Sequence, residues 1–546
     1  MESAKKSAAE FQLLRLEERI GNGEHQLLTA QLDELKRRWA TPRWNTIKRS
    51  YTAYDVVTKR GSLPSTYDSS IMGQKLFNLI KKHQAAGSAI TTYDTAGRKP
   101  RSAYVSGWTC SSLATTTNEV SPDLADYPYN TVPDQVERIW KAEKHHDRKQ
   151  WDARSKLSLE DKMKTPYKDY LMPIVADGDA GHGGLTTVMK LAKLFAESGA
   201  AAFHIEDQLQ GAKKCGHLAG KVVVSTSEQI DRLVAARFQL DVMNAELLLM
   251  ARTDSFGARL INSTVDVRDH EFILGVTDAS LSPLAEDLST MEADGVAKAT
   301  IDAFESSWLE TVRLVTIDEA AVEHLTRHGA SQQDIDAYVS EVQTSPNTSM
   351  TARRQLVQKL VNQPFYFSCE VPRTREGFYR FRGSLETVTK RLLAFAPYAE
   401  LLAAETSTPD LAVARQLAHP IKQAYPDRGL VYNLSPSFNW DGVMSLEKLK
   451  DFTTDLAQCG YVLQIVALGG FHSTARMIAE LSNRFKDEGM LAYVELIQRP
   501  ERQLKADILT HQKWSGIEYY QGILDSIRSG NSSMKMTGAD STEHQF

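Results

Sequence analysis

Cysteine is scarce in this chain, and its four copies are far apart. They are Cys110, Cys215, Cys369 and Cys459, and no two of them form a CxxC pair. This spacing argues against a disulfide framework and against a zinc cluster, so a reducing compartment is expected. With no cluster of histidine and cysteine, a metal site in this chain has to use oxygen ligands.

Strong net charge and long apolar runs are also missing. The net charge of -5 leaves no basic footprint for nucleic acid, and no apolar run is long enough to cross a membrane. The first 21 residues carry four glutamates, which is unlike a secretory signal, and the last six, STEHQF, are not a peroxisomal signal. We expect neither a nucleic-acid partner nor a membrane partner.

Apolar runs alternate with amphipathic helical stretches over most of the chain. Residues 171–184 predict a strand that enters a glycine-rich loop, and a helix and a second strand at 200–208 follow. A helix near 226–244 precedes the apolar run 247–254. Further runs lie at 398–406, 429–437 and 461–470. Strand, helix and strand in repetition predict parallel pairing with right-handed crossovers.

Polar side chains follow the apolar runs at their C-terminal ends. This placement is typical of a TIM (β/α)8 barrel, whose active site lies at that end of the strands. A doubly wound sheet is the alternative, but it binds ligands near one switch point only. The residues in question, able to bind or react, are Ser106, Gly107, Trp108, Asp177, Asp179, His204, Glu206, Asp207, Arg252, Thr253, Asp254, Glu405, Asn433, Ser435 and Ser437.

The domain organisation is expected to interrupt the barrel once. Residues 1–95 form an N-terminal helical segment, with Leu28, Leu32, Leu35 and Trp39 at helical spacing. Residues 96–264 form the first part of the barrel, with a catalytic loop. Residues 265–365 are charged, helical and without strand signals, and are interpreted as an insertion. Residues 366–546 complete the barrel and add C-terminal helices.

The segment Lys213–His217, KKCGH, stands out for its chemistry. Cys215 has two lysines before it and His217 close behind, and cationic neighbours lower the pKa of a thiol. Gly216 leaves room for close approach by a ligand. The alternative is a charged surface loop that contains a cysteine by chance.

Four acids supply hard oxygen ligands near this segment. Asp123, Asp177, Asp179 and Glu206 therefore predict a Mg²⁺ site, with Mn²⁺ also possible. Asp177 is expected to be the direct ligand, and the other three are expected to act partly through water. For any single aspartate the alternative is a helix N-cap.

The remaining candidates fit a carboxylate ligand. Arg252 offers a planar fork to a carboxylate, although it could pair with Asp254 instead. Asn433, Ser435 and Ser437 occupy alternate positions and offer donors to a second carboxylate; a proline turn is the alternative. A small polyanion, a divalent cation and a thiol that protonates carbon together describe a carbon–carbon lyase.

These residues resemble the isocitrate lyase and 2-methylisocitrate lyase family, and in particular its fungal-type mitochondrial branch. The resemblance runs from about residue 35 to the end. It rests on KKCGH with LAGK behind it, SGW (106–108), SPDLADYP (121–128), HDRKQ (146–150), ADGDAGHGG (176–184), HIEDQ (204–208), ARTD (251–254), PRTREGFYR (372–380), YNLSPSFNW (432–440), GGFH (469–472) and THQKWSG (510–516).

The resemblance implies a barrel whose last helix is exchanged between subunits, a homotetramer, and Mg²⁺-dependent cleavage of a small tricarboxylate into succinate and a 2-oxo acid. It implies that Cys215 is the acid and that Asp177 holds Mg²⁺, with Asp123, Asp179 and Glu206 in its water shell. Ser106, Gly107, Trp108 and Arg252 would bind the 2-oxo acid part; Gly216, His217, Asn433, Ser435 and Ser437 the succinate part. His204 and Glu405 would support the site.

Two branches of the family share this machinery. One cleaves 2-methylisocitrate to pyruvate and is expected in the mitochondrial matrix; the other cleaves isocitrate to glyoxylate in the cytosol or peroxisome. Ser368, Ala403 and Ala467 replace bulkier or different residues of isocitrate lyases, which favours the first branch. A phosphonomutase-type isomerase is argued against by KKCGH, and a silent paralogue is the non-enzyme alternative. The stretch 90–101 looks shorter than in the family.

Overall fold

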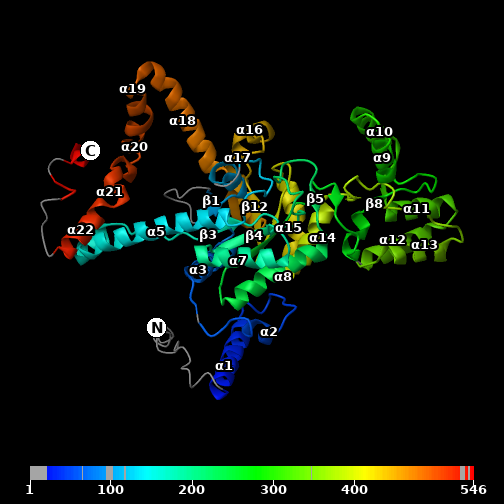
Figure 1. Ribbon diagram of the computed structural model, residues 1–546, viewed down its shortest axis with the longest axis horizontal. Coiled ribbons are helices and arrows are strands. Elements are labelled where there is room, and N and C mark those ends of the chain that lie inside the picture. Colours follow the sequence, from blue (N-terminus) through cyan, green and yellow to red (C-terminus); the bar gives the residue numbers. More distant parts are fainter. Residues whose placement is uncertain are drawn as a thin grey trace.

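Eight parallel strands close into a barrel in the computed structural model of this chain (Figure 1). The structure describes residues 21–63, 65–93, 102–115, 119–345, 347–528, 535–538 and 541–545. Around the barrel the strand order is β1, β13, β12, β11, β6, β4, β3, β2. The strands are β1 (Ile90–Tyr93), β2 (Ser102–Val105), β3 (Ile174–Asp177), β4 (Ala202–Glu206), β6 (Leu248–Thr253), β11 (Leu401–Ala404), β12 (Gly429–Asn433) and β13 (Tyr461–Val466). The predicted TIM barrel is confirmed.

The barrel strands are short apolar runs because helices cover them from outside. Ile174, Val175 and Ala176 of β3 are all buried, as are Phe203 and Ile205 of β4. The helices around them are α3 (Asp68–Ala85), α5 (Thr131–Ser155), α7 (Leu185–Ser198), α8 (Thr226–Val242), α14 (Leu385–Phe395), α15 (Leu411–Ala424) and α17 (Leu446–Gln458). Shorter helices are α4 (Gly107–Thr109), η1 (Cys110–Ala114), α6 (Leu159–Lys164), η3 (Ala396–Tyr398) and α16 (Trp440–Val443).

Strand register sets which side chains meet at the C-terminal edge. Glu206 is paired with Arg252, and Ala403 of the next strand is paired with Arg252 from the other side. On the opposite flank, Asp177 is paired with His204. Polar residues from strands that are well separated in sequence therefore emerge side by side at one rim.

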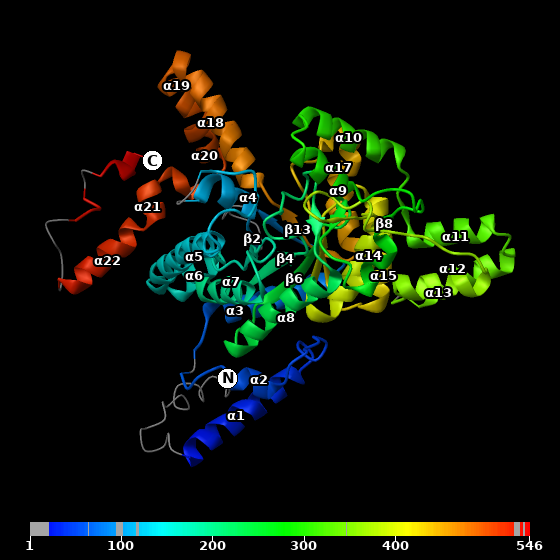
Figure 2. The same ribbon diagram turned by 45° about the vertical axis from the view of Figure 1, so that its right-hand side comes forward.

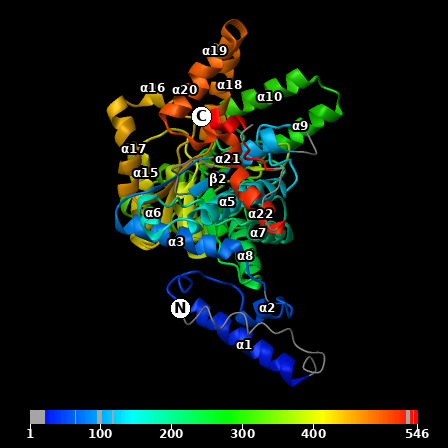
Figure 3. The same ribbon diagram turned by 90° about the vertical axis from the view of Figure 1, so that its left-hand side faces the viewer.

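An N-terminal helical segment packs beneath α8, as Figures 1 and 3 show. It comprises α1 (Asn22–Trp39) and α2 (Ala53–Val57). Leu35 and Val56 are buried there, and Arg49 Nε lies 2.7 Å from an Asp241 carboxylate oxygen. The expected helix at 28–39 is confirmed. The first barrel strand starts at Ile90, on the N-terminal side of the boundary expected at residue 95.

A helical body extends from the barrel between β6 and β11 (Figure 2). It contains η2 (Val267–Phe272), α9 (Leu284–Ala293), α10 (Lys298–Thr311), α11 (Ile317–Arg327), α12 (Gln332–Thr344) and α13 (Met350–Leu360). The expectation that this stretch has no strands is wrong, because β8 (Leu274–Gly275) pairs with β9 (Val315–Thr316). A second small sheet joins β5 (Val222–Val223), β7 (Leu260–Ile261) and β10 (Tyr379–Arg380).

The C-terminal region leaves the barrel as a projecting arm (Figures 1 and 3). It consists of α18 (Gly469–Glu488), α19 (Met490–Tyr493), η4 (Val494–Gln498), α20 (Arg499–Gln503), η5 (Asp507–Leu509), α21 (His511–Ser515), α22 (Ile517–Ile527) and η6 (Thr542–Gln545). The arm returns to α5, where a hydrogen bond of 2.8 Å joins His145 Nε2 to the carbonyl of Ser515. Among the described residues, no helix combines the length and apolar character that crossing a membrane requires.

Candidate active site

Asp177, at the end of β3, is held by three donors at the C-terminal rim of the barrel. Its Oδ2 accepts from the backbone N–H of Gly107 at 2.9 Å and from the hydroxyl of Tyr104 at 3.2 Å. Its Oδ1 accepts from the backbone N–H of Asp179 at 3.0 Å. His204 Nε2 lies 2.9 Å from the Tyr104 oxygen and 3.4 Å from Asp177 Oδ1. The carboxylate is therefore fixed in place before any ligand arrives.

Lys213 bridges two of the predicted metal-site acids. Its Nζ lies 2.7 Å from Asp123 Oδ1 and 2.7 Å from Asp179 Oδ1. Asp179 also accepts a hydrogen bond from Tyr127 and lies 3.1 Å from His182 Nε2. Asp123, Asp179 and His182 have φ values of 63°, 46° and 56°, which non-glycine residues adopt only at a cost. Strained backbone of this kind is typical of functional sites.

Arg252 is the centre of a third group. Its Nε lies 3.1 Å from Glu206 Oε2 and 2.9 Å from Asp254 Oδ2, and a terminal nitrogen lies 3.2 Å from Glu405 Oε2. Glu405 in turn accepts from the Asn433 amide at 3.1 Å, and its other contact is His217 Nε2 at 3.1 Å. Arg252 does pair with Asp254, which was the alternative considered for it. This pair does not occupy the whole guanidinium group, which also contacts Glu206 and Glu405.

The rim carries more negative than positive charge. Six buried carboxylates, Asp123, Asp177, Asp179, Glu206, Asp254 and Glu405, face three permanent cations, Lys213, Lys221 and Arg252. Burial raises the pKa of Asp123 to about 7, and it raises the pKa of Glu206 well above its usual range. Lys213 and His182 instead hold the pKa of Asp179 well below its usual range, despite its burial. This excess of carboxyl groups over cations fits a divalent cation, which would favour the ionised forms of Asp123 and Glu206.

The acids are not arranged as a complete metal cage. Within the part of the chain that the structure describes, no three His, Cys, Asp or Glu side chains are grouped closely enough to chelate an ion together. A site with one direct carboxylate and several waters is the arrangement that Mg²⁺ commonly adopts. The donor set therefore fits a hydrated Mg²⁺ better than a dehydrated transition metal.

The expectation that Cys215 has a lowered pKa is wrong. Burial raises the pKa of the Cys215 thiol to about 11, and the Asp123 carboxylate acts in the same direction. The physical reason is that the charge of Lys213 is already neutralised by Asp123 and Asp179, which lie 90 and 34 positions earlier in the chain. Cys215 is therefore a protonated thiol at neutral pH, and suits a proton donor better than a nucleophile.

Gly216 provides close approach, but to protein side chains. A Cβ at this position would lie 2.6 Å from Glu405 Cγ and 2.8 Å from an Arg252 terminal nitrogen. The loop that carries Cys215, residues 209–222, therefore lies directly against the Arg252 group, and any side chain at 216 would push the two apart.

The comparisons with known proteins agree with this geometry. The model of the isocitrate lyase family matches residues 31–546. The chain belongs to the isocitrate lyase family. It is 53% identical to "2-methylisocitrate lyase, mitochondrial" of Hypocrea atroviridis, an alignment that covers 99% of this chain and 98% of the relative. It is 44% identical to an isocitrate lyase of Pinus taeda, over 95% and 92% of the two chains. It is 43% identical to a mitochondrial 2-methylisocitrate lyase of Saccharomyces cerevisiae, over 93% and 91%.

A solved 2,3-dimethylmalate lyase of the same superfamily covers 88% of this chain and is itself covered completely, at 15% identity and a TM-score of 0.44. The barrel assignment therefore rests on the strand topology described above. Membership of the isocitrate lyase family makes the protein a carbon–carbon lyase.

The other predicted site residues lie at the same rim of the barrel. Their side chains do not all face in one direction. Ser106 caps α4, and the Trp108 ring lies 5.2 Å from the Phe471 ring. Ser435 is buried and accepts from the N–H of Ser437, which is exposed, so the two hydroxyls do not project together. Their alternation fails because β12 ends at Asn433, before either serine. Ala467 follows β13 and is half-buried.

Sequence reasoning missed several residues that line this rim. Tyr104 and Tyr127 donate to Asp177 and Asp179, and burial raises the pKa of both hydroxyls well above the usual range. Lys221 and Gln208 contact the catalytic loop. Tyr104 could have been found from its place in AYV, one of the runs that leads into the rim.

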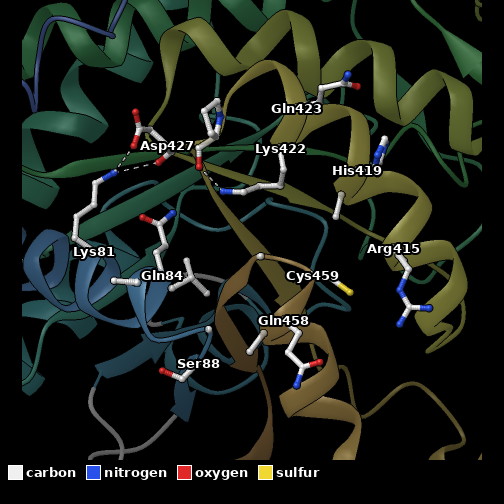
Figure 4. A pocket seen from close by; sticks show the side chains of 17 residues that line it. Lys81, Gln84, Ser88, Arg415, His419, Lys422, Gln423, Asp427, Gln458 and Cys459 are labelled. Carbon is white, nitrogen blue, oxygen red and sulfur yellow. Dashed lines mark hydrogen bonds and ion pairs between the residues drawn. The ribbon is translucent and has the colours of Figure 1, made fainter.

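A second cleft lies at the opposite end of the barrel (Figure 4) and is not part of the lyase site. It encloses about 890 Å³ between α3, α15 and the start of β13. Its lysines already have partners, since Lys81 Nζ lies 3.1 Å from Asp427 and Lys422 Nζ donates to the carbonyls of Pro426 and Arg428. Three helices end there, and cations near helix C-termini are expected for electrostatic reasons alone.

Proposed function

We propose that this enzyme cleaves 2-methylisocitrate to succinate and pyruvate. The observation that carries the proposal is the 53% identity, over nearly the whole of both chains, to a relative named as a mitochondrial 2-methylisocitrate lyase. The rim supports it with buried acids, an arginine and a protonated thiol at one end of the barrel. The cleavage breaks one carbon–carbon bond, and the substrate hydroxyl loses its proton as that carbon becomes the ketone of pyruvate.

Cys215 is proposed to donate the proton that the succinate carbon needs when this bond breaks. Its pKa of about 11 keeps the proton on sulfur at neutral pH, so it is available for transfer to a carbanion, which is a far stronger base. The close approach of Gly216, the residue after Cys215, to Glu405 and Arg252 supports this role. After transfer, the thiolate regains a proton from solvent.

Asp177 is proposed to hold Mg²⁺ directly, with Asp123, Asp179 and Glu206 in contact with it through water. A bound divalent cation supplies positive charge beside the oxygens of the substrate. Asp177 suits the direct role because three donors fix its carboxylate, whereas Lys213 occupies the space between Asp123 and Asp179.

The substrate carboxylates are proposed to bind on two sides of the thiol. Arg252, with Ser106, Gly107 and Trp108, would hold the 2-oxo acid part. Gly216, His217, Asn433, Ser435 and Ser437, next to Ala467, would hold the succinate part. Glu405 orients Arg252, His217 and Asn433, since it contacts all three, and His204 orients Tyr104 and Asp177.

Two small residues are proposed to make room for the extra methyl group. Ala403 is half-buried at the end of β11, opposite Arg252 in the register, and Ala467 follows β13. One methyl group changes binding by about 1–3 kcal/mol, so isocitrate would remain a weaker substrate. Isocitrate cleavage to glyoxylate is the second candidate function, since relatives named as isocitrate lyases are 44% and 41% identical.

Product analysis tests the proposal. The purified protein with Mg²⁺ is incubated with either acid, and succinate, pyruvate and glyoxylate are quantified. Succinate with pyruvate is expected from 2-methylisocitrate, and Cys215→Ser serves as the control. Release of neither 2-oxo acid would refute the proposal and favour a silent paralogue.

We further propose a homotetramer in the mitochondrial matrix. Two relatives are named as mitochondrial, which supports the compartment. The arm supports assembly by helix exchange, because Gly470 is the single buried residue of α18 while its apolar Ile478 and Phe485 are exposed. Matrix localisation is tested by fractionation of mitochondria.

A further inference from the structure

The catalytic loop is closed at its base by backbone hydrogen bonds. Leu209 N donates to the carbonyl of Val222 at 2.8 Å, and Val224 N donates to the carbonyl of Asp207 at 2.8 Å. Val222 and Val223 form β5, which pairs in parallel with β7. The residues between Leu209 and Val222 therefore leave and return at one rigid point. These hydrogen bonds at the base do not by themselves fix the position of the Cys215 thiol at the tip of the loop.

Gln208 holds the backbone on the N-terminal side of Cys215. Its amide nitrogen donates to the carbonyl of Lys214 at 2.8 Å, and its amide oxygen accepts from the N–H of Lys214 at 3.0 Å. The side chain thus satisfies both polar groups of the residue before the thiol. Gln208 is fully buried, and its nitrogen also donates to Glu206 at 2.9 Å, which fixes the amide in this orientation.

Lys221 holds the backbone on the C-terminal side. Its Nζ donates to the carbonyl of Gly216 at 2.6 Å and lies 3.2 Å from Asp254 Oδ1. The side chain is buried, and a Cβ at Gly257 would lie 3.2 Å from its ammonium nitrogen, so the position is closely confined. Asp254 also pairs with Arg252, which links this lysine to the substrate-binding group.

We propose that Gln208 and Lys221 are positioning residues that clamp the peptide on either side of Cys215 and so set where its proton is delivered. One comes from each end of the loop, and they act on Lys214 and Gly216, the two neighbours of the thiol. The inference rests on the proposed role of Cys215 as the proton donor. Loss of either clamp leaves the base of the loop closed and lets the tip move.

The test uses Lys221→Met and Gln208→Leu, which keep size and remove the hydrogen bonds. Because small misplacements of a reacting group cost about 100-fold in rate, kcat is expected to fall by about 10- to 100-fold in each, with a smaller change in KM. Lys190→Met, at an exposed lysine on α7, is the matched control and should leave both unchanged. In a Cys215→Ser background the two substitutions should add little to the loss.

A second measurement does not depend on the substrate. The rate at which iodoacetamide alkylates Cys215 at pH 7.5 is followed by mass spectrometry of the peptide. The clamp predicts slow alkylation in the parent protein and at least a fivefold faster rate in both variants, with thermal unfolding close to the parent. Unchanged alkylation and unchanged kcat in folded variants would overturn the clamp. Faster alkylation in a protein that cleaves neither acid would overturn the proposed function while sustaining the clamp.

Discussion

At the residue scale, the site works by burial more than by the sequence neighbours of each group. Cys215 has two lysines beside it in the chain, yet burial raises the pKa of its thiol to about 11, since the charge of Lys213 is neutralised by Asp123 and Asp179. Asp123 and Asp179 also differ through their surroundings. Burial raises the pKa of Asp123 to about 7, whereas Lys213 and His182 hold the pKa of Asp179 well below the usual range of a carboxyl group. The pKa of each group thus depends on burial and on the charged partners that the fold places beside it, not on its neighbours in the chain.

Replacement of Cys215 by serine should remove most of the activity. A hydroxyl holds its proton more tightly than a thiol, so kcat should fall by about 100- to 10,000-fold. Substrate affinity, measured by calorimetry, should stay within a few-fold, because the carboxylate-binding residues are intact. Cys459→Ser, at a half-buried cysteine on the opposite side of the barrel, is the control. Full activity in Cys215→Ser would assign the proton to another group.

Glu143 predicts a pH dependence of stability outside the site. Burial raises the pKa of this α5 carboxyl from 4.5 to about 8, so the fold favours its protonated form. That stabilising contribution is fully present below pH 4.5 and is lost as the pH rises through about 8. Glu143→Gln stays neutral, and its amide oxygen can still accept from the N–H of Met172 as Glu143 does at 3.1 Å.

The free energy of unfolding of Glu143→Gln, measured in urea, should match the parent at pH 5 and exceed it by about 1–4 kcal/mol at pH 9. Glu137→Gln, at an exposed carboxyl on the same helix, should show no such trend. Parallel pH profiles for the parent and Glu143→Gln would show that this carboxyl is not buried as described.

At the scale of elements, the helical insertion is tied to the active site by one arginine. Arg391 of α14 donates to Asp207 at 2.9 Å and to Asp269 of the insertion at 2.8 Å. Asp207 accepts from the N–H of Asp254 at 2.9 Å, next to the Arg252 group. The insertion therefore contacts the rim through three buried charges, although its helices extend away from it.

Arg391→Met should destabilise the protein by about 3–5 kcal/mol, because it leaves two buried carboxylates without their cation. The free energy of unfolding in urea measures this, and kcat should fall with it as Asp254 loses support. Arg382→Met is the matched control, since its partner Glu319 and Arg382 itself are about 40% exposed, and it should cost less than about 1 kcal/mol. Equal losses in the two variants would count against the coupling.

The elements that sequence predicted best are those with a strong physical pattern. Six barrel strands were predicted because helices cover them and their residues are continuous apolar runs, and the short apolar run Ala103–Val105 before Ser106 marked a seventh. The eighth, β1, was missed because Ile90–Tyr93 contains two threonines and is short. The stretch that was expected to be shorter than in the family continues through residues 94–101, which lie outside the described part of the chain.

That several candidate residues lie together at one rim was predictable, but their electrostatics were not. Asp177, Glu206 and Arg252 were identified because each follows a strand, and strands of a barrel end at one rim. The bridge from Lys213 to Asp123 could not be predicted, since it joins positions 90 residues apart through a turn with left-handed backbone. Tyr127 and Lys221 were missed for the same reason, because their partners come from other segments.

At the scale of the whole molecule, a closed barrel carries the chemistry and an exposed arm carries the proposed assembly. The α5 helix holds the returning part of that arm, where Lys149 donates to the carbonyl of Trp514 and the rings of His146 and Trp514 lie 4.7 Å apart. This contact brings together HDRKQ (146–150) and THQKWSG (510–516), two segments that carry the resemblance to the family. The arm is thus held where it returns to α5, while Ile478 and Phe485 of α18 are exposed.

Ile478→Asp should weaken the proposed assembly. Ile478 is 58% exposed on α18, so an aspartate is tolerated in a single chain but costs several kcal/mol in a buried interface between copies. Light scattering after size-exclusion chromatography should show a tetramer for the parent and smaller species for the variant. Leu446→Asp, on α17 with 79% exposure, is the control. A monomeric parent would refute the assembly.

The ratio of kcat/KM for 2-methylisocitrate to that for isocitrate, measured on one preparation with Mg²⁺, tests the account most directly. The small residues Ala403 and Ala467 and the relationship to a 2-methylisocitrate lyase predict a ratio above about 10, which corresponds to about 1.4 kcal/mol. A ratio of one or less would contradict the account and make isocitrate the substrate of this enzyme.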